Sequence, residues 1–214
     1  MRKKENMTAN KTGKYVETAE KYISIIGIFM CLVSVVALIL FIVLSAIHIP
    51  PDPAFTNDTG YRPGWQIMFW GYGKQIIYGK YEFSTNIPLC IAVLAPIIFT
   101  LVFAPMWKKA SNKKRFIFSA LLAVTLLVVG IVLFNICDVA LATASTTLTS
   151  SGRAMTEAIK NYPDEYYPSM LTRADAVITT LTGGIMVVNS VLNFKQREQK
   201  NMKVEIVESA TEKS

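Results

Sequence analysis

The sequence predicts an all-α integral membrane protein, a bundle of four transmembrane helices with a small extracellular loop of β-hairpin type and cytoplasmic termini. Hydrophobic residues make up 52% of the 214-residue chain and charged residues only 17%, whereas soluble domains carry about 25% charged residues. The hydrophobic residues gather in four uncharged blocks, each near the roughly 20 residues that a helix needs to cross a bilayer. Basic residues border these blocks unevenly, which predicts an orientation.

The first two apolar blocks are residues 23–47 and 87–107. The first block is longer than the apolar core of about 7–15 residues in a cleavable signal peptide, so we expect a membrane anchor. Residues 84–86, with the sequence Ser-Thr-Asn, offer helix N-caps just before the second block, and Pro88 is tolerated in a first turn. Both blocks are therefore predicted to form transmembrane helices.

The other two blocks are residues 116–137 and 176–194. The third block is strongly hydrophobic, and Lys195 ends the fourth one sharply. The fourth block is interrupted by polar side chains, namely Thr179, Thr180, Thr182, Asn189 and Asn193. Because hydroxyl and amide groups suit a helix that faces other helices more than lipid, we predict a fourth span that packs inside the bundle.

The distribution of basic residues predicts the orientation of this transmembrane domain, residues 23–194. Sixteen Lys and Arg residues lie in the N-terminal tail (1–22), the C-terminal tail (195–214) and the short loop between the second and third spans. Only six lie in the two long connecting segments, residues 48–86 and 138–175. Basic residues near span ends stay in the cytoplasm. We therefore predict cytoplasmic tails, two outer loops and a multi-pass protein of the cell (plasma) membrane.

The first outer loop, residues 48–86, divides into two parts. Four prolines and two glycines in the first part disfavour regular structure. The second part is rich in aromatic and β-branched residues, which predicts two short strands around a turn at residues 71–74. Its aromatic side chains form either an interfacial belt or a surface that contacts a partner. The candidate contact residues are Trp65, Trp70, Tyr72 and Tyr78.

The second outer loop, residues 138–175, begins with small and apolar residues that are predicted to extend the third helix above the bilayer, up to Ser151. Residues 152–162 then predict a short amphipathic helix. Asp138 and Arg173 lie just beyond the outer ends of the third and fourth spans. Opposite charges at a similar depth predict a clamp between these two helix ends, and a substrate or proton site is the alternative.

Small residues in the fourth span predict close helix packing. Thr179 with Gly183, and Thr180 with Gly184, follow the small-xxx-small spacing, which lets helix backbones approach closely. The spacing leaves three partners open: the first helix, the third helix and another copy of the chain.

Residues that carry chemistry are scarce. The only histidine, His48, ends the first span and is predicted to be an interfacial side chain, and the three cysteines fall within apolar blocks, where packing explains them better. The chain contains no HExxH, paired CxxC, GxSxG or phosphate-binding glycine motif. We therefore predict no catalytic, cofactor or metal site and no enzymatic activity. The basic residues border apolar blocks and form no basic helix, which argues against a nucleic acid partner.

A first apolar span, an aromatic outer segment ending in YEFS, a Lys-rich turn and a third span ending in LLVVGIVLFN follow one another in this chain. In this order the chain resembles uncharacterised four-span membrane proteins of low-GC Gram-positive bacteria. The resemblance covers most of the chain and implies a bacterial cell membrane but no activity. The topology is also similar to the claudin-like tetraspan plan. That family's GLW motif and two loop cysteines are missing here, so no claudin function is expected.

Two classes of function remain open. The first is a non-enzymatic accessory or interaction protein of the cell envelope, whose partners are the lipid bilayer and other membrane or envelope proteins or a second copy of the chain. The second is a subunit of an oligomeric channel or transporter, in which the polar face of the fourth helix lines a path. The first class fits better, because ionisable residues commonly mark transport paths and none interrupts the four apolar blocks.

The orientation is testable by cysteine labelling. In a cysteine-free background, Asn57→Cys and Ser150→Cys are expected to react with a membrane-impermeant maleimide in intact cells, because both lie in predicted outer loops. Ser111→Cys, in the Lys-rich loop, is expected to react only after the cells are broken. Labelling of Ser111→Cys in intact cells, with protection of the other two, would overturn the orientation.

Overall fold

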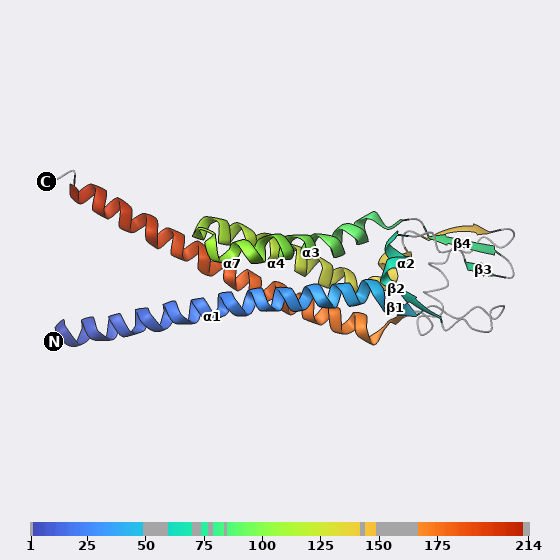
Figure 1. Ribbon diagram of the computed structural model, residues 1–214, viewed down its shortest axis with the longest axis horizontal. Coiled ribbons are helices and arrows are strands. Elements are labelled where there is room, and N and C mark those ends of the chain that lie inside the picture. The colour runs from blue at the N-terminus through green and yellow to red at the C-terminus, as the bar shows by residue number, and fades with distance from the viewer. Residues whose placement is uncertain are drawn as a thin grey trace.

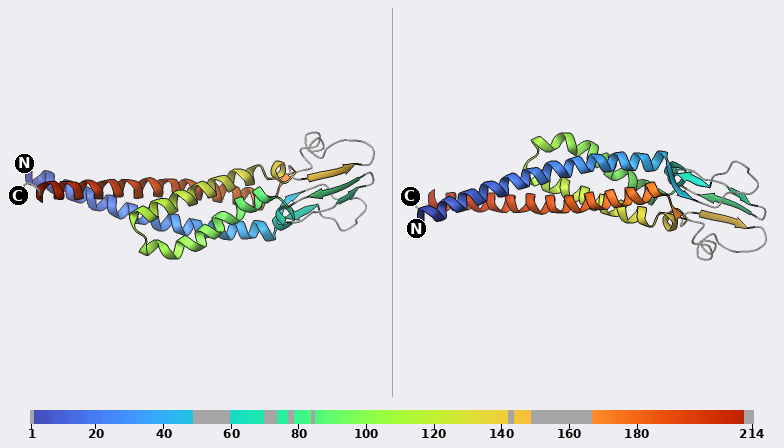
Figure 2. Two further views of the ribbon diagram at one scale, coloured as in Figure 1. Left: turned by 90° about the horizontal axis from the view of Figure 1, so that it is seen from above. Right: turned by 90° about the horizontal axis from the view of Figure 1, so that it is seen from below.

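The computed structural model describes residues 2–48, 60–69, 74–76, 79–83, 85–141, 144–148 and 167–211. Side chains are described at Thr18 and over residues 21–44, 46–48, 60–69, 85–140 and 167–196. The helices run along one axis, and small β-sheets lie at one end of it (Figure 1). We call this the sheet end. Both chain termini lie at the opposite end, which we call the terminal end (Figure 2).

Four long helices form the bundle: α1 (Arg2–Val43), α3 (Ile87–Met106), α4 (Asn112–Phe134) and α7 (Met170–Thr211). Each provides a segment long and apolar enough to cross a membrane: Lys21–Val43, Ile87–Lys109, Asn112–Phe134 and Met170–Gln196. The second of these segments runs past the end of α3. The prediction of four helices long and apolar enough to span a membrane is therefore confirmed. At the terminal end α1 and α7 continue past α3 and α4, so both tails leave the bundle as helices (Figure 1).

Three of the predicted spans end or begin elsewhere in the structure. The first span does not continue to residue 47, because α1 ends at Val43 and the next residues form strand β1 (Ser45–His48). The third span does not reach residue 137. Its helix α4 ends at Phe134, and the N–H of Asn135 closes the last turn onto the carbonyls of Ile131 and Val132 before the short helix α5 (Ile136–Leu141) begins. The fourth span begins six residues earlier than predicted, at Met170.

The link between α3 and α4 is short and held by hydrogen bonds. The 3-10 turn η1 (Trp107–Lys109) follows α3 directly. Ser111 caps α4, and its Oγ accepts a hydrogen bond from the N–H of Lys114 at 3.4 Å. Arg115 then reaches back and donates from Nε to the carbonyl of Trp107 at 3.1 Å and from Nη2 to the carbonyl of Lys108 at 3.2 Å. These bonds hold the turn that follows α3 onto the first turn of α4, and the carbonyl of Trp107 also accepts from the N–H of Ala110 at 3.3 Å.

At the sheet end, strands from both connecting segments pair with one another. One antiparallel sheet has the order β2-β1-β6, with β2 at Tyr61–Pro63 and β6 at Tyr167–Pro168. The other has the order β3-β4-β5, with bounds Lys74–Ile76, Gly79–Phe83 and Ala144–Leu148. Each sheet therefore ties the segment between α1 and α3 to the segment between α4 and α7.

The structure corrects two predictions about these segments. A strand over residues 65–70 is wrong, because Gly64–Phe69 form helix α2; the hairpin lies further on and pairs Ile76 with Gly79. A helix up to Ser151 is also wrong, because α5 ends at Leu141 and strand β5 follows. The β-branched threonines of β5 suit a strand, and β4 supplies the hydrogen-bonding edge. The predicted amphipathic helix over residues 152–162 lies outside the described residues.

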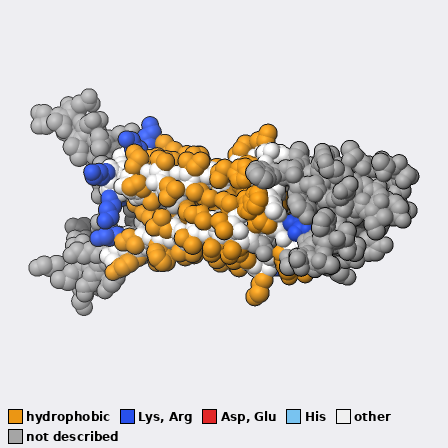
Figure 3. All heavy atoms as spheres, turned by 45° about the vertical axis from the view of Figure 1, so that its right-hand side comes forward, with side chains coloured by type: hydrophobic (Ala, Val, Ile, Leu, Met, Phe, Trp, Pro, Cys, Tyr) orange, Lys and Arg blue, Asp and Glu red, His pale blue; other side chains and the backbone are white. Residues whose placement is uncertain are grey.

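Side chains divide the bundle into an apolar outside and a mixed inside. Large hydrophobic side chains on the outward faces of all four helices are exposed, among them Phe29, Ile91, Ile131 and Leu181. On the face that Figure 3 shows, hydrophobic side chains form a broad belt between the two ends of the bundle. In water such a belt would be costly, whereas in lipid it is the expected surface. Polar residues such as Thr100, Ser119 and Asn189 are instead buried among the helices.

The most extensive contact between two helices lies between α4 and α7, where small residues face the partner helix. A Cβ atom added at Gly130 of α4 would collide with the hydroxyl of Thr180 and lie 3.3 Å from that of Thr179. A Cβ atom added at Gly183 of α7 would lie 2.8 Å from Leu127 of α4. Gly184 differs, because it is exposed and has open space where its Cβ would be.

These glycines give a matched pair of substitutions. Gly130→Leu is expected to destabilise the bundle by about 1–3 kcal/mol, since overpacking forces neighbouring side chains and backbones apart. Gly184→Leu is expected to change stability by less than about 0.5 kcal/mol, because nothing lies in its way. Thermal unfolding of the two detergent-purified variants measures the difference. Equal losses in both variants would contradict this account of the α4–α7 contact.

Candidate functional site

An aromatic cluster lies on the β2-β1-β6 sheet. The strand register places His48 of β1 directly opposite Tyr61 of β2 on one side and Tyr167 of β6 on the other. The imidazole stacks on Tyr167, with ring centroids 4.7 Å apart and planes 11° apart, and meets Tyr61 edge-on at 4.9 Å. The pKa of Tyr167 is raised above its usual value, chiefly because its side chain hydrogen-bonds with Tyr61.

The two tyrosines form one wall of an open groove beside the start of α7. The groove has a volume of about 860 Å³. Its other wall includes Met170, Arg173 and Val177 of α7. Met170 is 90% exposed. The groove therefore combines an exposed thioether, a guanidinium and two phenol rings at the edge of the apolar belt.

The predicted contact residues of the first outer loop are only partly placed. Trp65 lies in α2 and is half-buried. Trp70, Tyr72 and Tyr78 lie outside the described residues. Sequence patterns did not single out Tyr61 or Met170 and did not connect Tyr167 with His48. No local pattern reveals these contacts, because strands far apart in the chain create them.

The predicted clamp residues Asp138 and Arg173 lie on α5 and α7 at the sheet end. The charges of both residues affect the pKa of Cys137. The pKa of the Cys137 thiol is raised to about 11, chiefly because the side chain is buried. The carboxylate of Asp138 adds to this rise and the guanidinium of Arg173 opposes it. The contacts of the described side chains include no ion pair between Asp138 and Arg173, both of which are exposed. The clamp stays a prediction.

Along α7, polar side chains at helical spacing face the interior of the bundle. The buried members of this seam are Thr172, Asp175, Thr179, Thr182, Asn189, Ser190 and Asn193. Most find partners within the protein. Thr172 donates to the carbonyl of Ala46 at 2.7 Å, and Asn189 donates to the carbonyl of Ile23 at 3.3 Å, while Ser34 of α1 donates to the hydroxyl of Thr182 at 2.8 Å. The seam therefore joins α7 to α1 at Ser34 and Ile23, and to strand β1 at Ala46.

Asp175 is the exception within this seam. Its side chain is 2% exposed, and its Oδ2 atom has no hydrogen-bond partner among the described groups. The sequence placed Asp175 just beyond the fourth span, but the earlier start of α7 brings it inside the segment Met170–Gln196. One carboxyl group is therefore buried in the part of the bundle nearest the sheets.

Charged side chains are distributed unequally between the two ends. Near the terminal end the described charged side chains are all basic: Lys21, Lys108, Lys109, Lys113, Lys114, Arg115 and Lys195. At the sheet end they comprise two arginines, Arg62 and Arg173, and two aspartates, Asp138 and Asp175. Figure 3 shows the basic groups gathered at one edge of the apolar belt.

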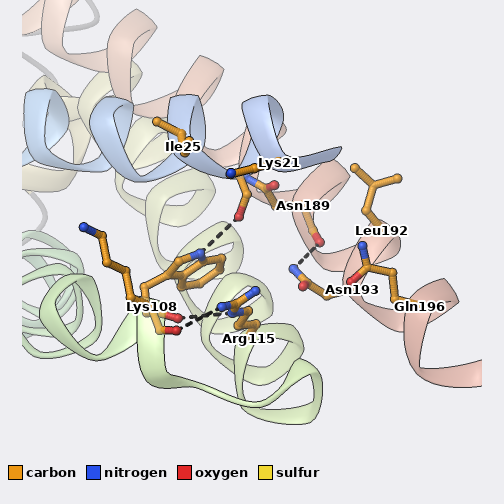
Figure 4. Close-up of a pocket in the computed structure, with 10 residues that line it drawn as sticks. Lys21, Ile25, Lys108, Arg115, Asn189, Leu192, Asn193 and Gln196 are labelled. Carbon is orange, nitrogen blue, oxygen red and sulfur yellow. Dashed lines mark hydrogen bonds between the residues drawn. The ribbon is translucent and has the colours of Figure 1, made fainter. Parts of the chain in front are cut away.

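A second cavity, of about 530 Å³, opens among these basic groups between α1, η1, α4 and α7. Lys21, Lys108 and Arg115 line it together with Asn189 and Asn193 (Figure 4). No cluster of three or more His, Cys, Asp or Glu side chains that could hold a metal ion occurs in the described part of the chain. The cysteines Cys31, Cys90 and Cys137 are free thiols.

Comparison with known proteins yields no relative. No family model matches the chain, and no curated protein or solved structure matches it. The resemblance to four-span proteins of Gram-positive bacteria therefore stays a prediction.

The proposed clamp is testable by a double-mutant cycle. Arg173→Asp is expected to lower the thermal stability of the detergent-purified protein, because it places a second negative charge near Asp138. Adding Asp138→Arg is expected to restore part of the loss. Since exposed pairs contribute at most about 1 kcal/mol, the expected coupling is a few tenths of a kcal/mol. Strict additivity of the two single changes would show that the residues do not interact.

Proposed function

We propose that this chain is a non-enzymatic accessory or interaction protein of the cell envelope that binds a partner through its sheet end. In this proposal the chain is inserted in the cell membrane with its two tails in the cytoplasm. The basic groups at the terminal end support that orientation, because cytoplasmic span ends carry an excess of Lys and Arg. The groove between Tyr61, Tyr167 and Met170 then faces outward.

The observation that carries the proposal is the anchoring of the β2-β1-β6 sheet and the neighbouring loops to the helix ends. The Nδ2 atom of Asn86 donates to the carbonyl of Val139 at 2.9 Å, while its Oδ1 caps α3. The N–H of Ser169 bonds to the carbonyl of Ala46 at 3.0 Å, and that of Asn86 bonds to the carbonyl of Met68 at 3.0 Å. Fixed backbones lower the entropy cost of binding, so this end suits recognition.

The composition of the groove supports the same conclusion. Tyr, Met and Arg are enriched in protein–protein interfaces, and buried Tyr and Arg often carry most of the binding energy. The groove presents Tyr61, Tyr167, Met170 and Arg173 together. We propose that an envelope protein or a second copy of this chain covers Met170, which is too exposed to contribute to the fold of its own chain.

The second candidate is a subunit of an oligomeric channel or transporter. Asp175 favours it, because an ionisable group inside a span is costly and commonly functional. The remaining polar seam favours the accessory function instead. Its hydrogen-bonded hydroxyl and amide groups bond to α1, to β1 or to carbonyls of α7 itself, as Thr179 does to the carbonyl of Asp175 at 2.7 Å. Groups that are already paired with protein have less capacity to coordinate a passing ion.

The accessory function is testable by site-specific photo-crosslinking in cells. A photoreactive residue at position 61 or 170 is expected to give a discrete adduct of higher mass. The same residue at position 131, which is exposed in the apolar belt, is the control and is expected to give none. Tyr167→Ala is expected to reduce the adduct at position 170, because it removes one wall of the groove.

Two outcomes would contradict the proposal. One is the absence of an adduct at positions 61 and 170. The other is saturable or ion-selective flux through the purified protein in vesicles, lost on changing Thr179, Thr182 and Asn189 to Val or Leu. That result would establish the channel or transporter function instead.

A further inference from the structure

The cavity at the terminal end brings together cations that lie far apart in the sequence. Lys21 comes from α1, Lys108 from η1 and Arg115 from α4, and all three line the same cavity (Figure 4). None of the described lining residues is acidic. Within the described contacts, the ammonium groups of Lys21 and Lys108 have neither an ion pair nor a hydrogen bond. Three positive charges therefore share a cavity of about 530 Å³ without a counter-charge from the described side chains.

Arg115 is held in place within this cavity. Its Nε and Nη2 atoms donate to the carbonyls of Trp107 and Lys108, so the plane of the guanidinium is set by the turn that it closes. A guanidinium has five N–H donors, and these two bonds use two of them. The remaining donors leave a planar fork, which is the geometry that binds phosphate oxygens well.

The other polar groups of the cavity are part of the helix packing. The Nδ2 atom of Asn189 bonds to the carbonyl of Ile23, and that of Asn193 bonds to the carbonyl of Asn189 at 2.7 Å. The indole N–H of Trp107 bonds to Ser24 at 3.0 Å. These bonds fix the walls of the cavity on α1 and α7. The two lysines are exposed and free to adjust to a bound group.

We propose that this cavity binds the phosphate of an anionic membrane lipid. The phosphate lies between Lys21, Lys108 and the fork of Arg115. The lipid chains follow the apolar belt from the edge of the cavity, where Ile25 and Leu192 line it. Ile25 is 55% exposed, and Tyr22 and Phe29 continue the same exposed face of α1. A lipid therefore places its charge and its chains on two surfaces that adjoin in the structure.

A soluble phosphate compound shares the headgroup chemistry but not the chains. The apolar edge of the cavity favours the lipid, because it contributes binding only when acyl chains cover it. The proposal also differs from the diffuse attraction between a basic loop and an anionic membrane. Diffuse attraction would involve Lys109 and Lys113 as much as Lys108, but only Lys108 of these three lines the cavity.

Thermal unfolding of the full-length protein in a neutral detergent tests the proposal. Phosphatidylglycerol is expected to raise Tm in a saturable manner, because a ligand that binds only the folded state stabilises it. Phosphatidylcholine is expected to have little effect. Lys21→Gln with Lys108→Gln is expected to weaken the apparent affinity for phosphatidylglycerol about 25-fold, at roughly fivefold for each lysine.

The matched control is Lys109→Gln with Lys113→Gln, which removes the same charge from exposed positions outside the cavity. The affinity of this control is expected to stay within about twofold of the unchanged protein. Equal weakening in both double variants would overturn the proposal in favour of diffuse attraction. The absence of any stabilisation by phosphatidylglycerol would overturn it as well.

The source of the phosphate is tested in the same assay with inorganic phosphate and glycerol 3-phosphate. We expect neither to raise Tm at concentrations where the lipid saturates. Stabilisation by these soluble compounds equal to that by the lipid, and lost in the Lys21→Gln, Lys108→Gln variant, would overturn the assignment to lipid. The cavity would then be a site for a soluble phosphate compound.

Discussion

The interior of this bundle depends on one constraint: polar groups of a membrane-spanning helix must find partners within the protein, because lipid offers none. Helix α7 carries most of these groups and turns them towards α1 and α4. The bond between Ser34 and Thr182 joins α7 to α1 near the middle of the spans, and Asn189 repeats the connection nearer the terminal end. The position of α7 is therefore set by hydrogen bonding as well as by packing.

Close packing of α4 against α7 complements these bonds. Gly130 lets the hydroxyl of Thr180 approach the backbone of α4, and Gly183 accommodates Leu127. In lipid there is no hydrophobic driving force between helices, so van der Waals contact and hydrogen bonds must hold them together. Helix α7 uses both kinds of interaction, because it presents polar side chains to α1 and a close-packed face with small residues to α4. Its remaining face is apolar and meets the belt around the bundle, as Leu181 and Val188 do.

The sequence predicted the features that depend on local pattern. The four spans follow from hydropathy and length, and the cap of α3 at Asn86 follows from a residue type that accepts from the N–H three positions on. The inward-facing polar residues of α7 were expected for the same kind of reason. The position of the hairpin was missed, because Gly64–Phe69 form a helix that packs against the ends of α1 and α3 instead of a strand.

The contacts that create the candidate sites were not predictable from local pattern. His48 stacks on Tyr167 only because β1 pairs with β6 across more than a hundred residues of chain. Asp175 is buried because α7 begins earlier than the hydropathy of its first turns suggests. Thr172 and Ser169 stabilise the beginning of α7 by donating hydrogen bonds to the carbonyl of Ala46. The cavity at the terminal end likewise needs α1, η1, α4 and α7 at once. Pairing between distant segments leaves no periodic signal in the sequence.

The two ends of the bundle differ in the kind of ligand that their chemistry suits. The groove at the sheet end joins aromatic rings, a thioether and one guanidinium, a mixture that recognises a mixed protein surface. The cavity at the terminal end joins three cations with an apolar edge, which matches an anion that carries hydrocarbon. The two sites share no lining residue. Loss of lipid binding in the lysine variants should therefore leave crosslinking at position 170 intact. Loss of both would show that the lipid sets the position of α7, the helix that lines both sites.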